Sequence, residues 1–324
     1  MKTIIGSYTK RKSEGIYSFN MDQSGLQERQ LIHPIQNPTY LYLNKDILLS
    51  VVKEGEEGGI AYFNKGQFIN QVTEPGTPPC YVSMDLNRDL VFSANFHESR
   101  INTYLLTGFG LIDHQVIQYE AGTKVHFVDY HAATDEVFVC LYGLSQVLIY
   151  GINKRHELFL KVTHQLSELS GPRHLVLHPS LPYVYVLAEA ISELLVLKRV
   201  DDTLVLSQNL STLPVGEDEI KSASAIRFGK DAKYIYVSNR GHDSITVFQV
   251  KEDGLCEWVQ NVSSLGKNPR DFNLSPNGQV IVIGNQDSDT LVSYQIDPLS
   301  GKLIKHLNTV EAYEPSCIVF QKEK

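Results

Sequence analysis

One pattern recurs along almost the whole of this chain of 324 residues. Each copy opens with a proline or a small residue and continues with an apolar stretch, a turn, a second apolar stretch and a polar pair. Successive copies are 41 to 51 residues apart. A period of this size, filled with short strands and without helical regularity, is typical of a β-propeller with one four-stranded blade per repeat. The copies begin at Pro38, Pro79, Val125, Pro172, Ala223, Pro269 and Pro315.

The two ends of the chain together supply one further blade. Residues 1–31 contain three strand-like segments but no inner strand before them, and residues 314–321 resemble an isolated inner strand. Pairing this last strand with the first three removes an open sheet edge. We therefore predict an all-β fold, a seven-bladed β-propeller, in which the N-terminal strands and the C-terminal strand close blade one. The whole chain, residues 1–324, is predicted to form a single domain.

Composition narrows the range of partners. The formal net charge is −8, the pI is near 5.8, and Lys and Arg form no long runs. This balance argues against nucleic acid or an anionic membrane as a main partner. An anionic small molecule fits, because a few arginines in a cleft set the local field. No apolar run is long enough for a signal peptide or a membrane span, so we expect a cytoplasmic protein.

Aligned repeats place polar residues at two equivalent positions. The residue after each repeat start opens the inner strand, and the residue 16 positions further on follows the end of the next strand. Neighbouring antiparallel strands bring the start of one beside the end of the next, so both positions should surround one opening of the central channel. Among the residues at these positions, the candidates for a site are His126, Arg173, Glu189, Arg240, Arg270 and Gln286.

Each of these residues has a structural explanation when taken alone. A histidine on a strand often serves as a hydrogen-bonding group, and an Arg–Glu pair is often a weak surface ion pair. Their convergence on consecutive blades favours a functional mouth. No HExxH or CxxC spacing, no GxSxG elbow and no dinucleotide fingerprint is present, so neither a metal nor another cofactor is expected. Buried, free thiols are expected at Cys80, Cys140, Cys256 and Cys317.

Several segments resemble the seven-bladed lactonase family, which includes a bacterial type of 6-phosphogluconolactonase and fungal carboxymuconate lactonising enzymes. The resemblance runs from end to end and is most specific in the string Ser-Asn-Arg-Gly-His-Asp-Ser-Ile, residues 238–245. The resembling segments are residues 6–9, 171–175, 237–245 and 268–272. In the muconate enzymes the site is a His, two Arg and a Glu in a channel mouth, and the matching residues here are His126, Arg173, Arg240 and Glu189.

The chain departs from the family pattern in blade four. The family usually carries an Asp-Leu-Gly-like segment there, and this chain has Leu141-Tyr142-Gly143. Phe96 stands where a tyrosine is common in the family. These differences affect the expected substrate more than the expected site.

The resemblance implies hydrolysis of a sugar lactone, with 6-phosphogluconolactone converted to 6-phosphogluconate. His126 is the expected general base, and Glu189 would orient it or act as the base itself. Arg173 and Arg240 would bind a phosphate or carboxylate, with one of them facing the oxyanion. Further predicted substrate contacts are Arg270, Gln286, Asn239 and His242, although turn chemistry also explains His242.

Two alternatives stay open at this point. A cycloisomerase of the carboxymuconate type could use the same cationic mouth to form a lactone from an unsaturated diacid. A propeller that binds a ligand without chemistry is the other alternative, because a fold does not imply a function. The sequence contains no feature that specifies the oligomeric state.

Overall fold

The computed structural model describes residues 1–217 and 222–321. Within these residues the only helix is a short 3-10 turn, η1 (Lys230–Ala232), and no helix has the length and apolar character needed to cross a membrane. The strands form seven antiparallel sheets of four strands each. This number confirms the seven blades predicted from the repeats.

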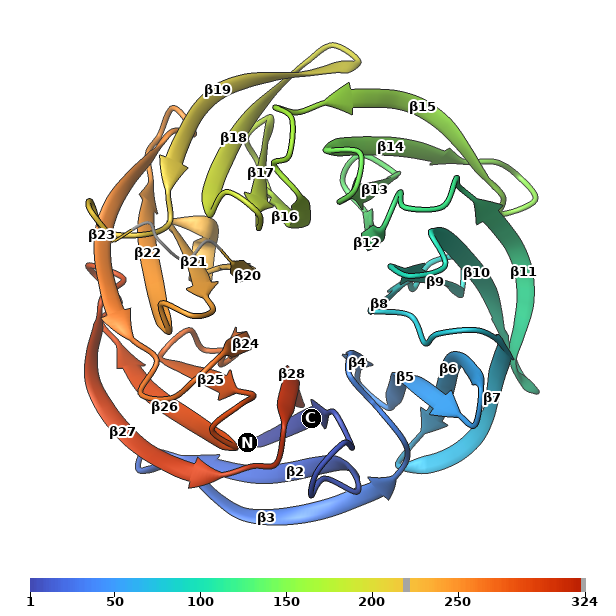
Figure 1. Ribbon diagram of the computed structural model, residues 1–324, viewed down its shortest axis with the longest axis horizontal. Helices are drawn as coiled ribbons and strands as arrows, with labels where there is room; N and C mark the ends of the chain where they lie inside the picture. Colours follow the sequence, from blue (N-terminus) through green and yellow to red (C-terminus); the bar gives the residue numbers. More distant parts are fainter. Residues whose placement is uncertain (218–221, 322–324) are drawn as a thin grey trace. The chain divides into compact units, whose positions relative to one another are not determined.

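The chain divides into two compact units, which we call the middle unit (residues 35–173) and the terminal unit (residues 1–34 and 174–324). The prediction of a single domain stays a prediction. The middle unit holds three complete sheets, in which each strand pairs with the next along the chain (Figure 1). Their strands are β4 (Leu41–Asn44), β5 (Ile47–Glu54), β6 (Glu57–Asn64), β7 (Gln67–Pro75), β8 (Tyr81–Asp85), β9 (Leu90–Asn95), β10 (Arg100–Thr107), β11 (Gly110–Gln118), β12 (Val125–His131), β13 (Glu136–Leu141), β14 (Gln146–Ile152) and β15 (Leu158–Gln165).

The other sheets belong to the terminal unit, and β16 begins at its boundary with the middle unit. Three of these sheets follow chain order, with β16 to β19, β20 to β23 and β24 to β27 as their members. The strands are β16 (Pro172–Leu177), β17 (Tyr183–Ala188), β18 (Glu193–Val200), β19 (Thr203–Ser211), β20 (Ala223–Phe228), β21 (Tyr234–Asn239), β22 (Ser244–Val250), β23 (Cys256–Ser263), β24 (Pro269–Leu274), β25 (Val280–Asn285), β26 (Thr290–Ile296) and β27 (Leu303–Glu311).

The remaining sheet joins the two ends of the chain. Strand β28 (Pro315–Gln321) pairs with β1 (Lys2–Ser7), and the sheet continues with β2 (Gly15–Asp22) and β3 (Gly25–Pro34). Lys2 lies opposite Gln321, and Ile5 lies opposite Ile318. The C-terminal strand therefore covers an edge of the N-terminal sheet, and the predicted closure of blade one is confirmed.

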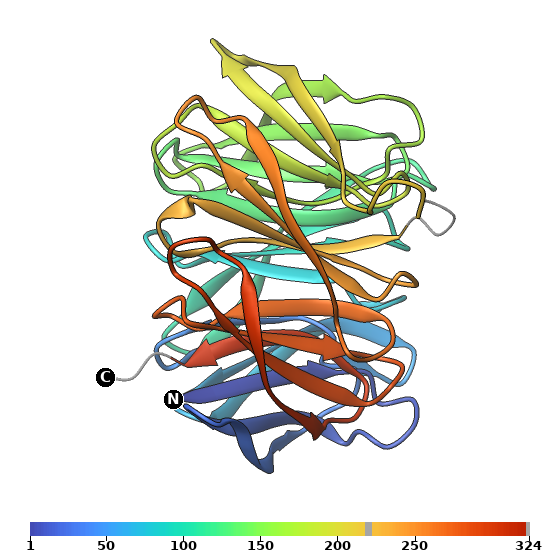
Figure 2. The ribbon, with the colours of Figure 1, turned by 90° about the vertical axis from the view of Figure 1, so that its left-hand side faces the viewer.

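The second and the fourth strand of a sheet differ in how deeply their residues are buried. Strands β17 and β21 are buried along their whole length, which explains their nearly continuous apolar sequences. The outer strands β19 and β27 consist mostly of exposed and half-buried residues because one face meets solvent. Each sheet is strongly twisted, as Figure 2 shows for the orange and red strands.

Hydrogen bonds from two buried tyrosines join neighbouring sheets in the terminal unit. The hydroxyl of Tyr185 donates to the carbonyl of Gly254, and that of Tyr236 donates to Gly301, each at 2.8 Å. Burial raises the pKa of both tyrosines, so the hydroxyls stay protonated donors. Gly254 has a φ of +83°, and an added Cβ would lie 2.3 Å from the ring of Tyr183. The turn therefore requires glycine both for its backbone angle and for the close approach of the ring.

Candidate functional site

The start of each inner strand lies beside the residue that follows the second strand, as the repeat alignment predicts. In three sheets the residue after the second strand donates its N–H to the carbonyl of the residue just before the repeat start. This geometry places the side chains at both positions on the same rim of their sheet. The bonds join Tyr142 to Lys124 (3.0 Å), Arg240 to Ser222 (3.0 Å) and Gln286 to Asn268 (2.9 Å).

His126 and Arg173 form a buried pair in the middle unit. Arg173 Nη1 lies 2.6 Å from His126 Nε2, and the two residues are only 6% and 5% exposed. A guanidinium has no acceptor, so Nε2 accepts the hydrogen bond and the proton of the neutral imidazole sits on Nδ1. Protonation of Nε2 would break this bond and place a second positive charge beside the guanidinium. The pair therefore holds His126 in the form that can accept a proton.

An aromatic ring packs against the imidazole, and a second ring packs against the first. Phe96 meets the His126 ring edge-on at 5.4 Å between centroids and meets Tyr142 at 5.5 Å. The thiol of Cys80 lies 3.5 Å from the carbonyl oxygen of His126. Lys124 places its ammonium 5.6 Å from the centre of the Phe96 ring and 5.9 Å from that of Tyr142. The repeat alignment places Phe96 and Tyr142 at the same position as Glu189 and Arg240, whereas Lys124 was not identified from the sequence.

Glu189 and Arg240 form the corresponding pair in the terminal unit. Glu189 follows β17 and Arg240 follows β21, so the two residues occupy equivalent positions in neighbouring sheets. Arg240 Nη2 donates to Glu189 Oε1 at 2.6 Å, and the side chains are 15% and 16% exposed. The repeat alignment placed both residues at the position that follows the second strand of a sheet, and the ion pair shows that the two side chains are close together.

Arg270 and Gln286 lie beside the loop that follows β1. The guanidinium of Arg270 lies 5.2 Å from the centre of the Tyr8 ring, and the ammonium of Lys10 lies 4.7 Å from the same ring. The carbonyl of Gln286 accepts a hydrogen bond from Arg11 at 2.9 Å. Both predicted residues therefore belong to a basic rim of the terminal unit to which the N-terminal loop contributes.

Residues 2–320 match the family model described as Lactonase, 7-bladed beta-propeller. The chain belongs to this family. Its fold is accordingly a seven-bladed β-propeller, in agreement with the seven sheets. The resemblance found in the sequence is thereby confirmed over nearly the whole length of the chain.

Named relatives of this lactonase-family chain include enzymes. The 6-phosphogluconolactonase of Bacillus subtilis (strain 168) is 31% identical over 339 residues, covering 98% of this chain and 97% of the relative. A crystal structure of a protein from Lactobacillus plantarum is 33% identical, with a TM-score of 0.93 and 98% coverage of both chains. The periplasmic gluconolactonase PpgL of Pseudomonas aeruginosa is 25% identical, with a TM-score of 0.89 and 98% coverage of both chains.

Asn239 has a structural role in this lactonase-family fold. Its side chain is completely buried, and its amide is hydrogen-bonded to Thr212 and Thr246. These bonds tie β21 and β22 to the segment after β19. The buried hydrogen bonds of Asn239 give it this structural role, and its contact with a substrate stays a prediction.

His242 uses both ring nitrogens within the protein. Nδ1 lies 2.7 Å from the hydroxyl of Ser244, and Nε2 lies 2.7 Å from a carboxylate oxygen of Glu217. The ring therefore links the turn after β21 to the segment that follows β19. Its contact with a substrate stays a prediction.

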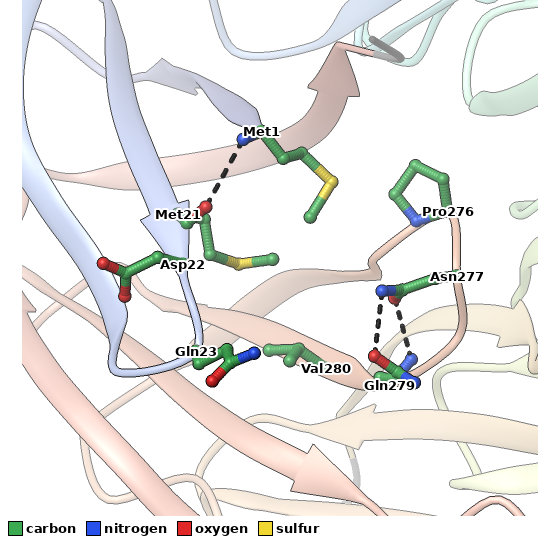
Figure 3. A pocket seen from close by; sticks show the side chains of 8 residues that line it. All are labelled: Met1, Met21, Asp22, Gln23, Pro276, Asn277, Gln279 and Val280. Carbon is green, nitrogen blue, oxygen red and sulfur yellow. Dashed lines mark hydrogen bonds between the residues drawn. The ribbon is translucent and has the colours of Figure 1, made fainter.

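A cavity of about 610 Å³ lies elsewhere in the terminal unit, at the opposite ends of β24 and β25 from Arg270 and Gln286 (Figure 3). None of the described residues that line it is an arginine, lysine or histidine. Across residues 1–217 and 222–321, no group of three or more His, Cys, Asp or Glu side chains could hold a metal ion. The cavity is lined by Met1, Met21, Asp22, Gln23, Pro276, Asn277, Gln279 and Val280.

Proposed function

We propose that this protein hydrolyses a sugar lactone, 6-phosphogluconolactone, to the open-chain acid 6-phosphogluconate. Membership of the lactonase family and the name of the Bacillus subtilis relative support this choice of substrate class. The observation that carries the proposal is the buried hydrogen bond between Arg173 and His126. It combines a neutral imidazole, which can act as a base, with a cation that can stabilise an oxyanion.

In the proposed reaction, a water molecule attacks the lactone carbonyl carbon while Nε2 of His126 takes its proton. The carbonyl oxygen becomes an oxyanion, which the Arg173 guanidinium stabilises. The ring C–O bond then breaks, and the departing ring oxygen takes the proton back from Nε2. Water is thus added across one C–O bond, and His126 returns to its neutral form.

Arg173 has to exchange partners during this reaction. Its N–H occupies the Nε2 lone pair of His126 in the described structure. A substrate carbonyl oxygen that draws the guanidinium away would free Nε2 as the negative charge on oxygen develops. Binding of the substrate would thereby activate the base and place the oxyanion donor in one movement.

Glu189 and Arg240 are included in the proposed catalytic set because of their equivalent repeat positions and the family resemblance. Arg240 is already bonded to a carboxylate. Its further N–H groups therefore suit neutral hydroxyl groups of a sugar better than a second anion. We assign Arg240 to the lactone hydroxyls and Glu189 to holding Arg240 in place, which replaces the phosphate contact expected from the sequence.

The test is His126→Ala, with His131→Ala as the matched control at the opposite end of the same strand, β12. Loss of a general base should lower kcat/KM for 6-phosphogluconolactone by about a hundredfold or more. The control should retain the wild-type value, and thermal unfolding should show that both variants are folded. An unchanged rate for His126→Ala, after subtraction of spontaneous hydrolysis, would refute the proposal.

A further inference from the structure

Lys124 occupies a backbone position that suits other residues better. The residue just before the repeat start has a φ between +47° and +60° in five repeats. Glycine and asparagine adopt this left-handed conformation most readily, whereas a long side chain such as lysine is uncommon there. The five residues are Asn37, Lys124, Gly171, Asn268 and Glu314.

Glu314 shows what such an exception achieves. Its buried carboxylate accepts the backbone N–H groups of Lys10, Arg11 and Lys12, at 2.8 to 3.3 Å. The side chain of Glu314 thus stabilises the conformation of the N-terminal loop. Among the described residues, the side chain of Lys124 makes no comparable structural contact and lies over two aromatic rings.

The ammonium of Lys124 is exposed and carries an unbalanced positive charge. Within residues 1–217 and 222–321, no carboxylate lies within ion-pair distance of it. A cation–π contact at an exposed site stabilises a cation by only about 0.5–1 kcal/mol and leaves its charge in place. The rings of Phe96 and Tyr142 therefore position the ammonium without neutralising it.

One aromatic ring connects this charge to the proposed base. Phe96 contacts the imidazole of His126 at 5.4 Å and the ammonium of Lys124 at 5.6 Å. A small molecule whose carbonyl reaches His126 can therefore extend an anionic group to Lys124. The backbone N–H of Lys124 donates a hydrogen bond to Ser99 Oγ at 3.1 Å. This bond fixes the point from which the lysine side chain extends.

We propose that Lys124 binds the phosphate group of the substrate and so selects phosphorylated over neutral sugar lactones. This inference deepens the proposed function and rests on it. A lysine suits the task because its ammonium binds phosphate as a compact point charge. The assignment complements that of Arg240, whose charge is already balanced by Glu189.

The test compares Lys124→Met with Lys45→Met. Lys45 is an exposed lysine of the same unit with the same left-handed backbone, φ +50°, in the turn between β4 and β5. We expect Lys124→Met to lower kcat/KM for 6-phosphogluconolactone by about ten- to a hundredfold, the effect of losing a hydrogen bond to a charged group. The value for glucono-1,5-lactone should change less than about twofold, and Lys45→Met should behave as wild type with both lactones.

Two outcomes overturn the assignment of Lys124. One is an equal loss with both lactones, and the other is no loss with either. If the wild-type protein hydrolyses neither lactone, the proposed function fails and calorimetric binding of 6-phosphogluconate decides the role of Lys124. Binding that weakens in Lys124→Met and not in Lys45→Met supports the role, whereas equal binding by all three proteins, or none by the wild type, overturns it.

Discussion

The two arginine pairs of this protein differ in partner and in burial. Arg173 in the middle unit meets a neutral imidazole, and both side chains are almost completely buried. Arg240 in the terminal unit meets a carboxylate, and both side chains keep about a sixth of their surface exposed. Counted by formal charge, the first pair is positive and the second is neutral.

This difference separates a residue that can exchange partners from one that is fixed. Moving Arg173 onto a substrate oxygen replaces one hydrogen bond from a charged donor to a neutral acceptor, which contributes about 1.5–3 kcal/mol. Moving Arg240 would break a hydrogen bond between two ionised groups and would also separate opposite charges. We therefore expect Arg173 to act in the chemical step and Arg240 to act in binding.

The largest expected effect comes from Arg173→Met. Loss of the oxyanion donor should lower kcat for 6-phosphogluconolactone by about a hundred- to a thousandfold, with a smaller effect on KM. Arg173→Lys restores the charge without the planar guanidinium and should recover only part of the rate. Steady-state kinetics measure both variants. A kcat close to wild type in Arg173→Met would contradict the assignment of Arg173 to the chemical step.

A smaller effect is expected from the pair in the terminal unit. Arg240→Met and Glu189→Gln should each raise KM by about tenfold with little change in kcat, because the contacts with hydroxyl groups persist through the reaction. The double variant should be little worse than either single one, with a coupling free energy of about 0.5–3 kcal/mol. Additive losses in this double-mutant cycle would show that the two residues act independently.

The smallest effect on activity is expected from Asn239→Ala, next to Arg240 in the chain. Its kcat/KM should stay within about twofold of wild type, because the amide is buried away from any ligand. Its free energy of unfolding should fall by about 1–3 kcal/mol, since the hydroxyls of Thr212 and Thr246 lose buried partners. Urea unfolding measures the stability. A large fall in kcat/KM of the folded variant would show that Asn239 acts in the site.

Much of the fold could be predicted because the repeat is regular. Pro269 and Asn285 lie opposite each other across β24 and β25, as their spacing in the repeat requires. The same repeat spacing places Glu189 and Arg240 at equivalent positions of neighbouring sheets, where they form an ion pair. The hydrogen bonds of Asn239 could not be predicted from the repeat, because its partner Thr212 lies 27 positions earlier in a connection that the repeat does not describe.

Lys124 was missed for a different reason. It lies immediately before a repeat start, at a position that the alignment did not compare. Its position follows from a left-handed backbone and from two rings contributed by different sheets, Phe96 and Tyr142. The signal that could have identified it is a lysine at a position occupied in the other repeats by asparagine, proline, glycine, serine and glutamate.

The sequence by itself determined the number of sheets, the joining of the two chain ends and the positions that share a rim. Antiparallel pairing within a repeat of 41 to 51 residues predicts these features, so they could be inferred from spacing. Only the tertiary structure decided that Arg173 bonds to an imidazole and Arg240 to a carboxylate. Which side chains meet across neighbouring sheets depends on their reach, rotamer and burial, and the repeat period specifies none of these.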